Sequence, residues 1–171
     1  MKSNLVYEEL KLPYKIHDEP YAAVSILVYK EKEVLFIKRS NDMPTHKGHI
    51  AFPGGKKEKN DLSIVDTAIR EASEELLIDR NLVEPIGQIN PVDTIEFKYK
   101  VYPILCKLSE KPKSYNKNEV QNVFLVPIED LRNPKNWRFR GIYPDDWIFR
   151  IDKETLWGAT AKMTRVLLRL A

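Results

Sequence analysis

Apolar, β-branched runs separated by polar segments predict several β-strands. The run from Ala22 to Tyr29 and the run from Val34 to Lys38 lie on either side of a charged segment, and together they predict a β-hairpin or two neighbouring strands. Further runs predict strands at residues 86–92, 94–99, 101–108, 120–126 and 147–151. The polar stretches between them, notably residues 40–50 and 109–118, predict loops.

Apolar positions at helical spacing predict helices near the middle and at the end of the chain. Ser63 followed by Asp66 is a capping-box variant, so the first helix should begin after Ser63, and its apolar stripe should end near Asp79. From Glu154 onward a second stripe predicts a C-terminal amphipathic helix, and a short helix is expected at residues 128–131. Strands interspersed with two or three helices predict an α/β or α+β sandwich.

The composition suits one compact domain, which we expect to span residues 1–171. The 28 Lys+Arg and 25 Asp+Glu residues leave a net charge of +3, which permits an anionic small-molecule substrate. The chain has no concentrated basic patch of the kind expected in a nucleic-acid-binding protein. Cys106 is the single cysteine, so a disulfide framework and a cysteine zinc site are excluded, and we expect a buried, inert thiol.

The sequence favours a protein that works away from membranes. No apolar signal core follows the first residues, and no apolar run approaches membrane-spanning length. We therefore expect a cytoplasmic protein that binds neither membrane nor nucleic acid. A homodimer remains open.

The segment Arg70-Glu71-Ala72-Ser73-Glu74-Glu75 carries the most informative chemistry. Glu71, Glu74 and Glu75 stand at i, i+3 and i+4, and they share one helix face within roughly 60° of its centre because a helix advances about 100° per residue. Like charges at these spacings repel, and Arg70 is the only basic residue between Ser63 and Ile78. This face predicts a site for a hard divalent cation with oxygen ligands, with a solvated acidic face as the alternative.

The turn Phe52-Pro53-Gly54-Gly55 precedes this helix and adds a second feature to the site. Two successive glycines let the backbone approach a ligand closely, so a carbonyl of Gly54 or Gly55 is able to join the helix carboxylates around a metal. Positive groups that suit phosphates lie close to the turn in sequence, namely His46, Lys47, Lys56 and Lys57. Together these features indicate metal-assisted phosphoryl chemistry, in which a carboxylate deprotonates or orients the attacking water.

Residues Gly55 to Ile78 resemble the signature box of the Nudix hydrolases, which cleave nucleoside diphosphates linked to another group. The family box usually reads Gly, five residues, Glu, seven residues, then Arg-Glu-aliphatic-x-Glu-Glu-x-Gly-aliphatic. Here the spacing from Gly55 to Arg70 is one residue longer, and Asp61 takes the first acidic position. Both features are similar to the coenzyme A diphosphatase branch, whereas Leu77 replaces the usual helix-ending glycine.

Segments on both sides of the box resemble the same branch. Upstream, Arg39-Ser40, Gly48 and the Phe-Pro-Gly-Gly turn stand in register, with His46 where a histidine is common and Pro44 where the branch normally has an arginine. The similar elements downstream are Asn118-Glu119-Val120, Phe124, Val126-Pro127 and Leu156-Trp157-Gly158-Ala159-Thr160-Ala161. The resemblance therefore runs from about Tyr21 to the C-terminus.

The resemblance implies a fold and a set of roles. The fold would be an α/β/α sandwich around a mixed β-sheet. Glu71 and Glu75 would be the principal ligands of Mg²⁺ or Mn²⁺, with the Gly55 carbonyl contributing and Glu74 completing the acidic face directly or through water. Arg70 would pair with Asp61 or a neighbouring glutamate and orient the carboxylates, and Glu119 would be an additional ligand or the catalytic base. The implied substrate-binding residues are Arg39, His46, Lys47 and Gly54.

The implied reaction is attack of water on the diphosphate of coenzyme A or a derivative, giving phosphopantetheine and adenosine 3′,5′-bisphosphate. Because of Pro44, the same chemistry on ADP-ribose, a dinucleoside polyphosphate or a nucleoside triphosphate stays open. A non-catalytic nucleotide-sensing domain is an alternative of another class. One further hypothesis is that three lysines of the 109–118 loop, Lys111, Lys113 and Lys117, hold the 3′-phosphate of the adenosine.

Overall fold

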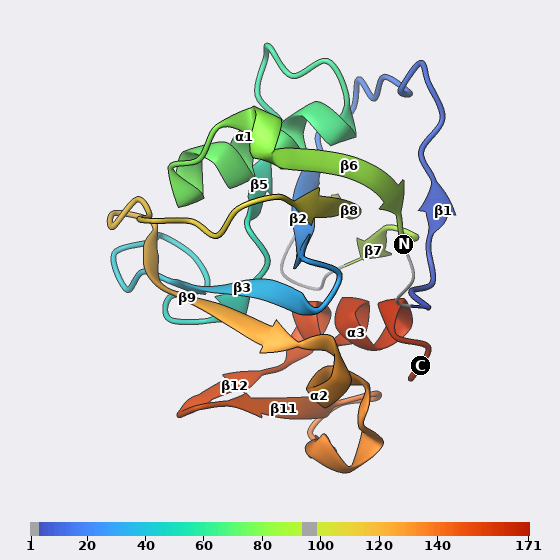
Figure 1. The fold of residues 1–171 in the computed structure, drawn as a ribbon, viewed down its shortest axis with the longest axis vertical. Coiled ribbons are helices and arrows are strands. Elements are labelled where there is room, and N and C mark those ends of the chain that lie inside the picture. The colour runs from blue at the N-terminus through green and yellow to red at the C-terminus, as the bar shows by residue number, and fades with distance from the viewer. Residues whose placement is uncertain (1–3, 94–98) are drawn as a thin grey trace.

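The computed structural model describes residues 4–93 and 99–171, and a mixed β-sheet forms its centre (Figure 1). The sheet runs in the order β1-β6-β8-β2-β3-β4, with β5 beside β2, β7 beside β8 and β9 beside β3. Strands β2 and β8 are parallel, and the other neighbours are antiparallel. The strands are β1 (Glu8–Glu9), β2 (Ala22–Tyr29), β3 (Glu33–Arg39), β4 (Ile50–Ala51), β5 (Gly54–Lys56), β6 (Val83–Gln88), β7 (Val92–Asp93), β8 (Lys100–Leu108) and β9 (Val120–Pro127).

Helices cover both faces of this sheet (Figure 1). Helix α1 (Ile64–Leu76) packs on one face, while α3 (Gly158–Leu167) packs on the other together with a small antiparallel sheet. The small sheet consists of β10 (Trp137–Phe139), β11 (Trp147–Ile151) and β12 (Glu154–Leu156), and the short helices are α2 (Ile128–Arg132), η1 (Arg80–Leu82) and η2 (Pro134–Asn136). The expected α/β/α sandwich around a mixed sheet is confirmed.

Strand β2 shows why the layers form. Its side chains alternate between the two faces, so Ala23 and Leu27 join the core under α1 while Ile26 and Val28 join the core under α3. All four are at most 1% exposed, as expected for a central strand that is covered on both sides. The strand also carries a polar side chain into the α1 layer, where Ser25 Oγ donates a 2.8 Å hydrogen bond to the Ala68 carbonyl.

Helix α1 begins where the sequence predicts and ends earlier. Ser63 Oγ accepts from the Asp66 amide at 3.1 Å, which satisfies one of the free donors of the first turn. The helix ends at Leu76 rather than near Asp79, because Leu77 takes the left-handed conformation with φ 51°. The Ile78 amide then donates back to the Ser73 carbonyl at 3.2 Å, the closing bond of a Schellman motif. Leu77 therefore occupies the backbone position where the family pattern has glycine.

The C-terminal region differs from the sequence-based expectation. The helix expected from Glu154 begins at Gly158, because residues 154–156 pair with β11 as β12. Trp157 is extended and Gly158 has φ 64°, so the chain turns sharply before the helix. Strand β10 was not expected, and the run at 86–92 is divided between β6 and β7. The strand expected at 94–99 falls on residues of which 94–98 lie outside the described part.

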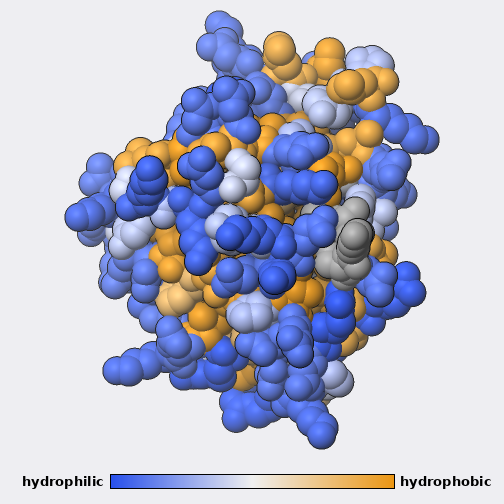
Figure 2. All heavy atoms as spheres, in the orientation of Figure 1, coloured by the Kyte–Doolittle hydropathy of each residue, from blue (hydrophilic) through white to orange (hydrophobic). Residues whose placement is uncertain are grey.

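The helices of the described residues are short, and the face of the molecule drawn in Figure 2 is mostly polar. None of the helices in the described ranges is both long and apolar enough to cross a membrane. Hydrophilic side chains cover most of the face drawn in Figure 2, with smaller hydrophobic areas between them. Cys106 is fully buried, as expected, and burial raises the pKa of its thiol to about 12.

Replacing Leu77 with glycine is expected to stabilise the fold. A side chain in the left-handed region costs about 1 kcal/mol, and Leu77 is 58% exposed, so little apolar contact is lost. Leu77→Gly should raise the Tm in thermal unfolding by about 2–4 °C for a chain of this size. The matched variant Leu77→Ala keeps the Cβ atom and should not gain stability; a Tm for Leu77→Gly below that of Leu77→Ala would contradict this account.

Candidate metal centre

Three carboxylates from two separate segments meet at one point of the structure. Glu71 and Glu75 come from α1 and Glu119 from the loop before β9, and one oxygen of each lies within 4.8 Å of one oxygen of each of the others. Glu75 is buried at 3% exposure, while the other two are half-buried. Oxygen ligands at this spacing match the preference of hard divalent cations. The sequence predicted Glu71 and Glu75 together, and the fold adds Glu119 to them.

Backbone hydrogen bonds hold Glu119 in place. The Asn116 amide donates to the Glu75 carbonyl at 2.8 Å, which ties the 109–119 loop to the C-terminal part of α1. The Ser40 amide donates to the Glu119 carbonyl at 2.9 Å, which ties the same loop to the end of β3. The loop is therefore anchored three residues before Glu119 and at the Glu119 carbonyl itself.

The carboxylate of Glu75 is only partly satisfied. The Gly54 amide donates to its Oε1 at 3.3 Å, whereas Oε2 is buried and has no hydrogen-bond partner within the described residues. Burial first, and then the neighbouring Glu71 charge, raise the pKa of Glu75 well above its usual value. Burial likewise raises the pKa of Glu71. A buried carboxylate oxygen without a partner in the described ranges, close to two other carboxylates, fits a site for a cation.

The two glycines of β5 leave the space that the Glu71 carboxylate and strand β2 occupy beside them. A Cβ atom on Gly55 would lie 2.6 Å from Glu71 Cδ, so any side chain there would displace the carboxylate. A Cβ atom on Gly54 would lie 2.6 Å from Val24 Cγ1, because β5 pairs directly with β2. Both glycines therefore allow β5 to lie against β2 and α1 at the same time.

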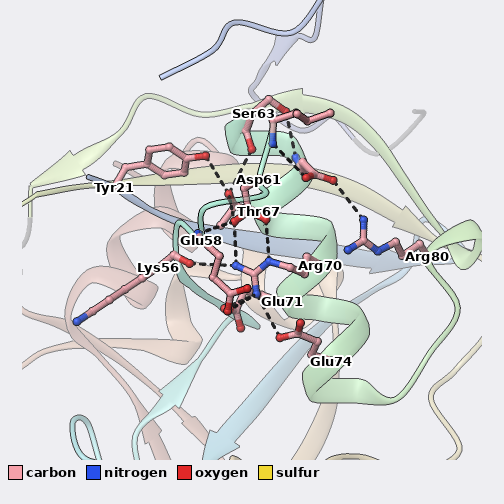
Figure 3. Close-up of polar contacts among 12 residues, drawn as sticks. Tyr21, Lys56, Glu58, Asp61, Ser63, Thr67, Arg70, Glu71, Glu74 and Arg80 are labelled. Atoms are coloured by element: carbon pink, nitrogen blue, oxygen red, sulfur yellow. Dashed lines mark hydrogen bonds and ion pairs between the residues drawn. The ribbon is translucent and has the colours of Figure 1, made fainter. Parts of the chain in front are cut away.

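Arg70 organises the acidic residues around a buried guanidinium (Figure 3). It pairs with Asp61 through two bonds, Nε to Oδ1 at 2.8 Å and Nη2 to Oδ2 at 2.9 Å, and this bidentate geometry is the strong form of the interaction. The remaining acceptors are the Lys56 carbonyl at 3.0 Å, Glu71 at 3.1 Å, Glu74 at 3.2 Å and Glu58 at 3.3 Å. The hydrogen bonds that Arg70 donates to Asp61 raise the pKa of Arg70, which keeps the guanidinium charged.

A hydrogen-bond chain behind Arg70 includes two residues that the sequence did not single out. Tyr21 Oη lies 2.9 Å from Thr67 Oγ1, and Thr67 Oγ1 donates to Asp61 Oδ2 at 2.8 Å (Figure 3). Because a threonine hydroxyl has one proton, the Tyr21 hydroxyl donates to Thr67 in this arrangement. Burial alone would raise the pKa of Asp61, but the bonds from Arg70, the Glu58 amide and Thr67 lower it overall. The chain fixes Asp61, and through it Arg70.

Glu74 lies apart from the three carboxylates that converge. Its side chain is 53% exposed and pairs with Arg70. It does group with Glu71 and the exposed Glu58, whose oxygens also lie within 4.8 Å of one another. The acidic helix face thus divides at Glu71, with Glu75 directed inward and Glu74 outward. A role for Glu74 through water stays a prediction.

The predicted substrate-binding residues lie at the edge of the centre. Arg39 ends β3 and donates from Nε and Nη2 to the Thr45 carbonyl at 3.4 and 3.3 Å, and its charge opposes the rise in the pKa of Glu75. His46 lies beside His49 with ring centroids 5.4 Å apart, and Lys47 is exposed. Gly54 contacts Glu75 directly through its amide. Of these four residues, two interact with the Glu75 carboxylate in the structure: Gly54 through a hydrogen bond and Arg39 through its charge.

Neutralising Glu75 is expected to stabilise the metal-free protein. A raised pKa in the folded state means that ionised Glu75 opposes folding at neutral pH, and that stability rises as the pH falls toward the usual glutamate range. Glu75→Gln should raise the Tm at pH 7 by at least about 2 °C and should abolish the rise in Tm that Mg²⁺ or Mn²⁺ gives the unaltered protein. The exposed Glu129→Gln is the control, and an unchanged metal effect in Glu75→Gln would count against the centre.

Removing the charge of Asp61 is expected to destabilise the fold. Asp61→Asn leaves the buried Arg70 without its main partner, which costs about 3 kcal/mol at pH 7. Because the pKa of Asp61 is lowered in the folded state, its stabilisation is present above the usual aspartate range and is lost as the pH falls through the lowered value. The difference in stability between the unaltered protein and Asp61→Asn should therefore shrink on acidification, measured by denaturant unfolding at several pH values. Equal differences at pH 7 and pH 3 would contradict this explanation.

Comparison with known proteins identifies the family. The NUDIX domain model matches residues 19–146. A relative from Pectobacterium atrosepticum with the name "Uncharacterized Nudix hydrolase NudL" is 33% identical, over 93% of this chain and 88% of its own length. A protein of the same name from Yersinia enterocolitica is 29% identical, over 84% of this chain and 76% of its own length.

Solved structures share the fold. A crystal structure from Deinococcus radiodurans superposes with a TM-score of 0.58 at 13% identity, covering 91% of this chain and 86% of the other. A binary complex of a Caenorhabditis elegans Ap4A hydrolase gives a TM-score of 0.51 at 23% identity, covering 63% of this chain and 80% of the other. At these identities the likeness concerns the fold. By its domain match and its relatives, this chain belongs to the Nudix hydrolases, a family of pyrophosphohydrolases that act on nucleoside diphosphate derivatives and generally use divalent metal ions.

Proposed function

We propose that this protein hydrolyses the diphosphate of coenzyme A or a derivative in a reaction that depends on Mg²⁺ or Mn²⁺, giving phosphopantetheine and adenosine 3′,5′-bisphosphate. The observation that carries the metal dependence is the meeting of Glu71, Glu75 and Glu119, with the buried Glu75 Oε2 left without a partner in the described part of the chain. The expected single domain over residues 1–171 and the cytoplasmic location are retained as parts of this proposal.

The carboxylates present fit a divalent cation in number and chemistry. Glu71 and Glu75 would hold it, with the backbone of Gly55 beside Glu71 available as a further oxygen donor. A cation bound there supplies neutralisation of the diphosphate charge and activation of water. Arg70 keeps the Glu71 carboxylate in position through its 3.1 Å contact. Arg39 places a positive charge at the end of β3, where it would bind a substrate phosphate.

Glu119 suits either of two roles at its position. It is half-buried, so its carboxylate is accessible to water, and backbone hydrogen bonds at Asn116 and at its own carbonyl hold it near the other two carboxylates. As a ligand it would contribute to metal affinity, whereas as a base it would accept the proton of the attacking water. Glu119→Gln separates the roles, because loss of a ligand weakens metal binding and loss of a base lowers kcat at saturating metal.

The coenzyme A assignment rests on the flanking motifs, whose positions converge in the fold. The Arg39-Ser40 element and the Asn118-Glu119-Val120 element are adjacent, since Arg39 pairs with Val120 across β3 and β9. Pro44 favours a second candidate function, the same chemistry on ADP-ribose, a dinucleoside polyphosphate or a nucleoside triphosphate, because the arginine of the branch is missing from an exposed loop position. The retained carboxylates and the family assignment argue against a non-catalytic sensing domain.

Product analysis with purified protein tests the proposal. In the presence of Mg²⁺ or Mn²⁺, coenzyme A should be converted to adenosine 3′,5′-bisphosphate faster than ADP-ribose is hydrolysed. Glu71→Gln and Glu75→Gln should each lower kcat/KM by roughly 100-fold or more, while the exposed Glu129→Gln should retain the unaltered rate.

The outcomes separate the metal centre from the substrate. A normal rate in either Glu71→Gln or Glu75→Gln would refute the metal centre. If ADP-ribose is hydrolysed and coenzyme A is not, the metal centre is supported and the coenzyme A assignment is refuted. The second candidate function would then replace it.

A further inference from the structure

A cavity of about 420 Å³ lies between two loop segments next to the metal centre. Residues 40–42 form one wall, and residues from Tyr115 to Gln121 form the other. The volume is within the range of about 300–1,000 Å³ that is typical of small-molecule sites.

The cavity adjoins the reacting groups of the proposed function. Its wall residue Ser40 follows Arg39, and its wall residue Val120 follows Glu119. The Ser40 amide donates to the Glu119 carbonyl at 2.9 Å, so the two walls are joined at the end nearest the carboxylates. A group bound in this cavity would therefore be continuous with a phosphate held at Arg39 and Glu119.

The lining combines neutral polar groups with one exposed cation, Lys117, and one exposed carboxylate, Asp42. Asn41 and Gln121 bring side-chain amides, which hold both donors and acceptors. Tyr115 contributes an aromatic ring whose hydroxyl donates to the Gln121 carbonyl at 2.9 Å, which fixes the ring in the wall. Lys117 is exposed, and within the described residues its ammonium group makes no hydrogen bond or ion pair. An anion in the cavity would meet a cation that is not already neutralised.

Other basic groups near the centre are less well placed. Lys111 of the same loop lies over the Tyr29 ring at 5.4 Å, and Tyr29 is beside Glu33 at the far end of β3 from Arg39. Lys111 therefore lies away from this cavity and from Arg39. A second cavity of about 240 Å³ contains Lys57, but that ammonium already donates to the His17 carbonyl at 2.7 Å.

We propose that the cavity between residues 40–42 and 115–121 binds the nucleoside half of the substrate, and that Lys117 pairs with a phosphate on its ribose. The inference rests on the proposed function and deepens it, since it assigns the residue that distinguishes a ribose-phosphorylated nucleotide from the same nucleotide without that phosphate. Lys117 contacts substrate away from the scissile bond, so it determines specificity and takes no part in the chemical step.

Matched substrates test the role of Lys117. With coenzyme A, Lys117→Ala should raise KM about 5- to 10-fold and leave kcat unchanged, because one charge-assisted contact to a phosphate is lost. With 3′-dephospho-coenzyme A, the same variant should stay within about twofold of the unaltered protein. Lys135→Ala, which removes an equal charge at an exposed position outside the cavity lining, should change the kinetics of neither substrate. An equal effect of Lys117→Ala on both substrates, or none on coenzyme A, would overturn the inference.

Binding of the nucleotide alone separates this inference from the proposed function. In calorimetry, adenosine 3′,5′-bisphosphate should bind more weakly to Lys117→Ala than to the unaltered protein, while AMP should bind both alike. If coenzyme A is not hydrolysed and this pattern holds, the proposed function fails and the cavity assignment stands. If coenzyme A is hydrolysed and Lys117→Ala binds the bisphosphate normally, the function stands and the assignment fails. No detectable binding of the bisphosphate to the unaltered protein also overturns the assignment.

Discussion

The buried guanidinium of Arg70 is the interaction on which the site depends. It joins Asp61 and the Lys56 carbonyl, which precede α1, to Glu71 on the helix itself. The i, i+3 and i+4 spacing of the helix glutamates creates repulsion, and one positive charge at the side of the helix offsets part of it. Because a guanidinium stays protonated throughout the pH range in which proteins fold, this compensation does not depend on pH through Arg70. The loop and the helix are thus held together whether or not a cation is bound.

Glu75 lies beyond this compensation, so its charge is the one that a cation at the proposed centre would neutralise. Glu75 is 3% exposed, and among the described residues its carboxylate accepts one hydrogen bond, from the Gly54 amide. The uncompensated charge weakens the fold in the absence of metal, and the same free energy becomes available when a cation or a proton binds. A local conflict of this kind, at a position where the surrounding packing is otherwise complete, is typical of a functional site. Glu71 and Glu75 lie one helical turn apart and therefore affect the stability differently. The charge of Glu71 is partly compensated by Arg70, whereas the charge of Glu75 destabilises the fold.

The sequence predicted the parts of the site that depend on local geometry. Glu71 and Glu75 share a helix, so their spacing alone placed them on one face. The contact of Tyr21 with Thr67 joins residues 46 positions apart, and no local pattern indicates it. The position of Glu119 likewise follows from tertiary hydrogen bonds to α1 and β3. The C-terminal helix was predicted to begin too early, because residues 154–156 fit the helical spacing of apolar positions. In the structure these residues pair with β11, and this pairing outweighs the local preference.

The site has a helical part, which carries Glu71 and Glu75, and a loop part, which carries Pro44. This explains how Pro44 can differ from the residue in the coenzyme A diphosphatase pattern while the carboxylates stay in place. Pro44 is exposed in a loop whose backbone is held elsewhere, by the Arg39 amide to the His49 carbonyl at 2.9 Å and the Gly48 amide to the Arg39 carbonyl at 3.0 Å. A substitution at this position would change one exposed loop side chain without moving the end of β3. Since β3 carries Arg39 and pairs with β9 after Glu119, the metal centre keeps its geometry while the loops around it vary. If the proposed function holds, substitutions in this loop would alter substrate choice while the carboxylates of the proposed centre keep their positions.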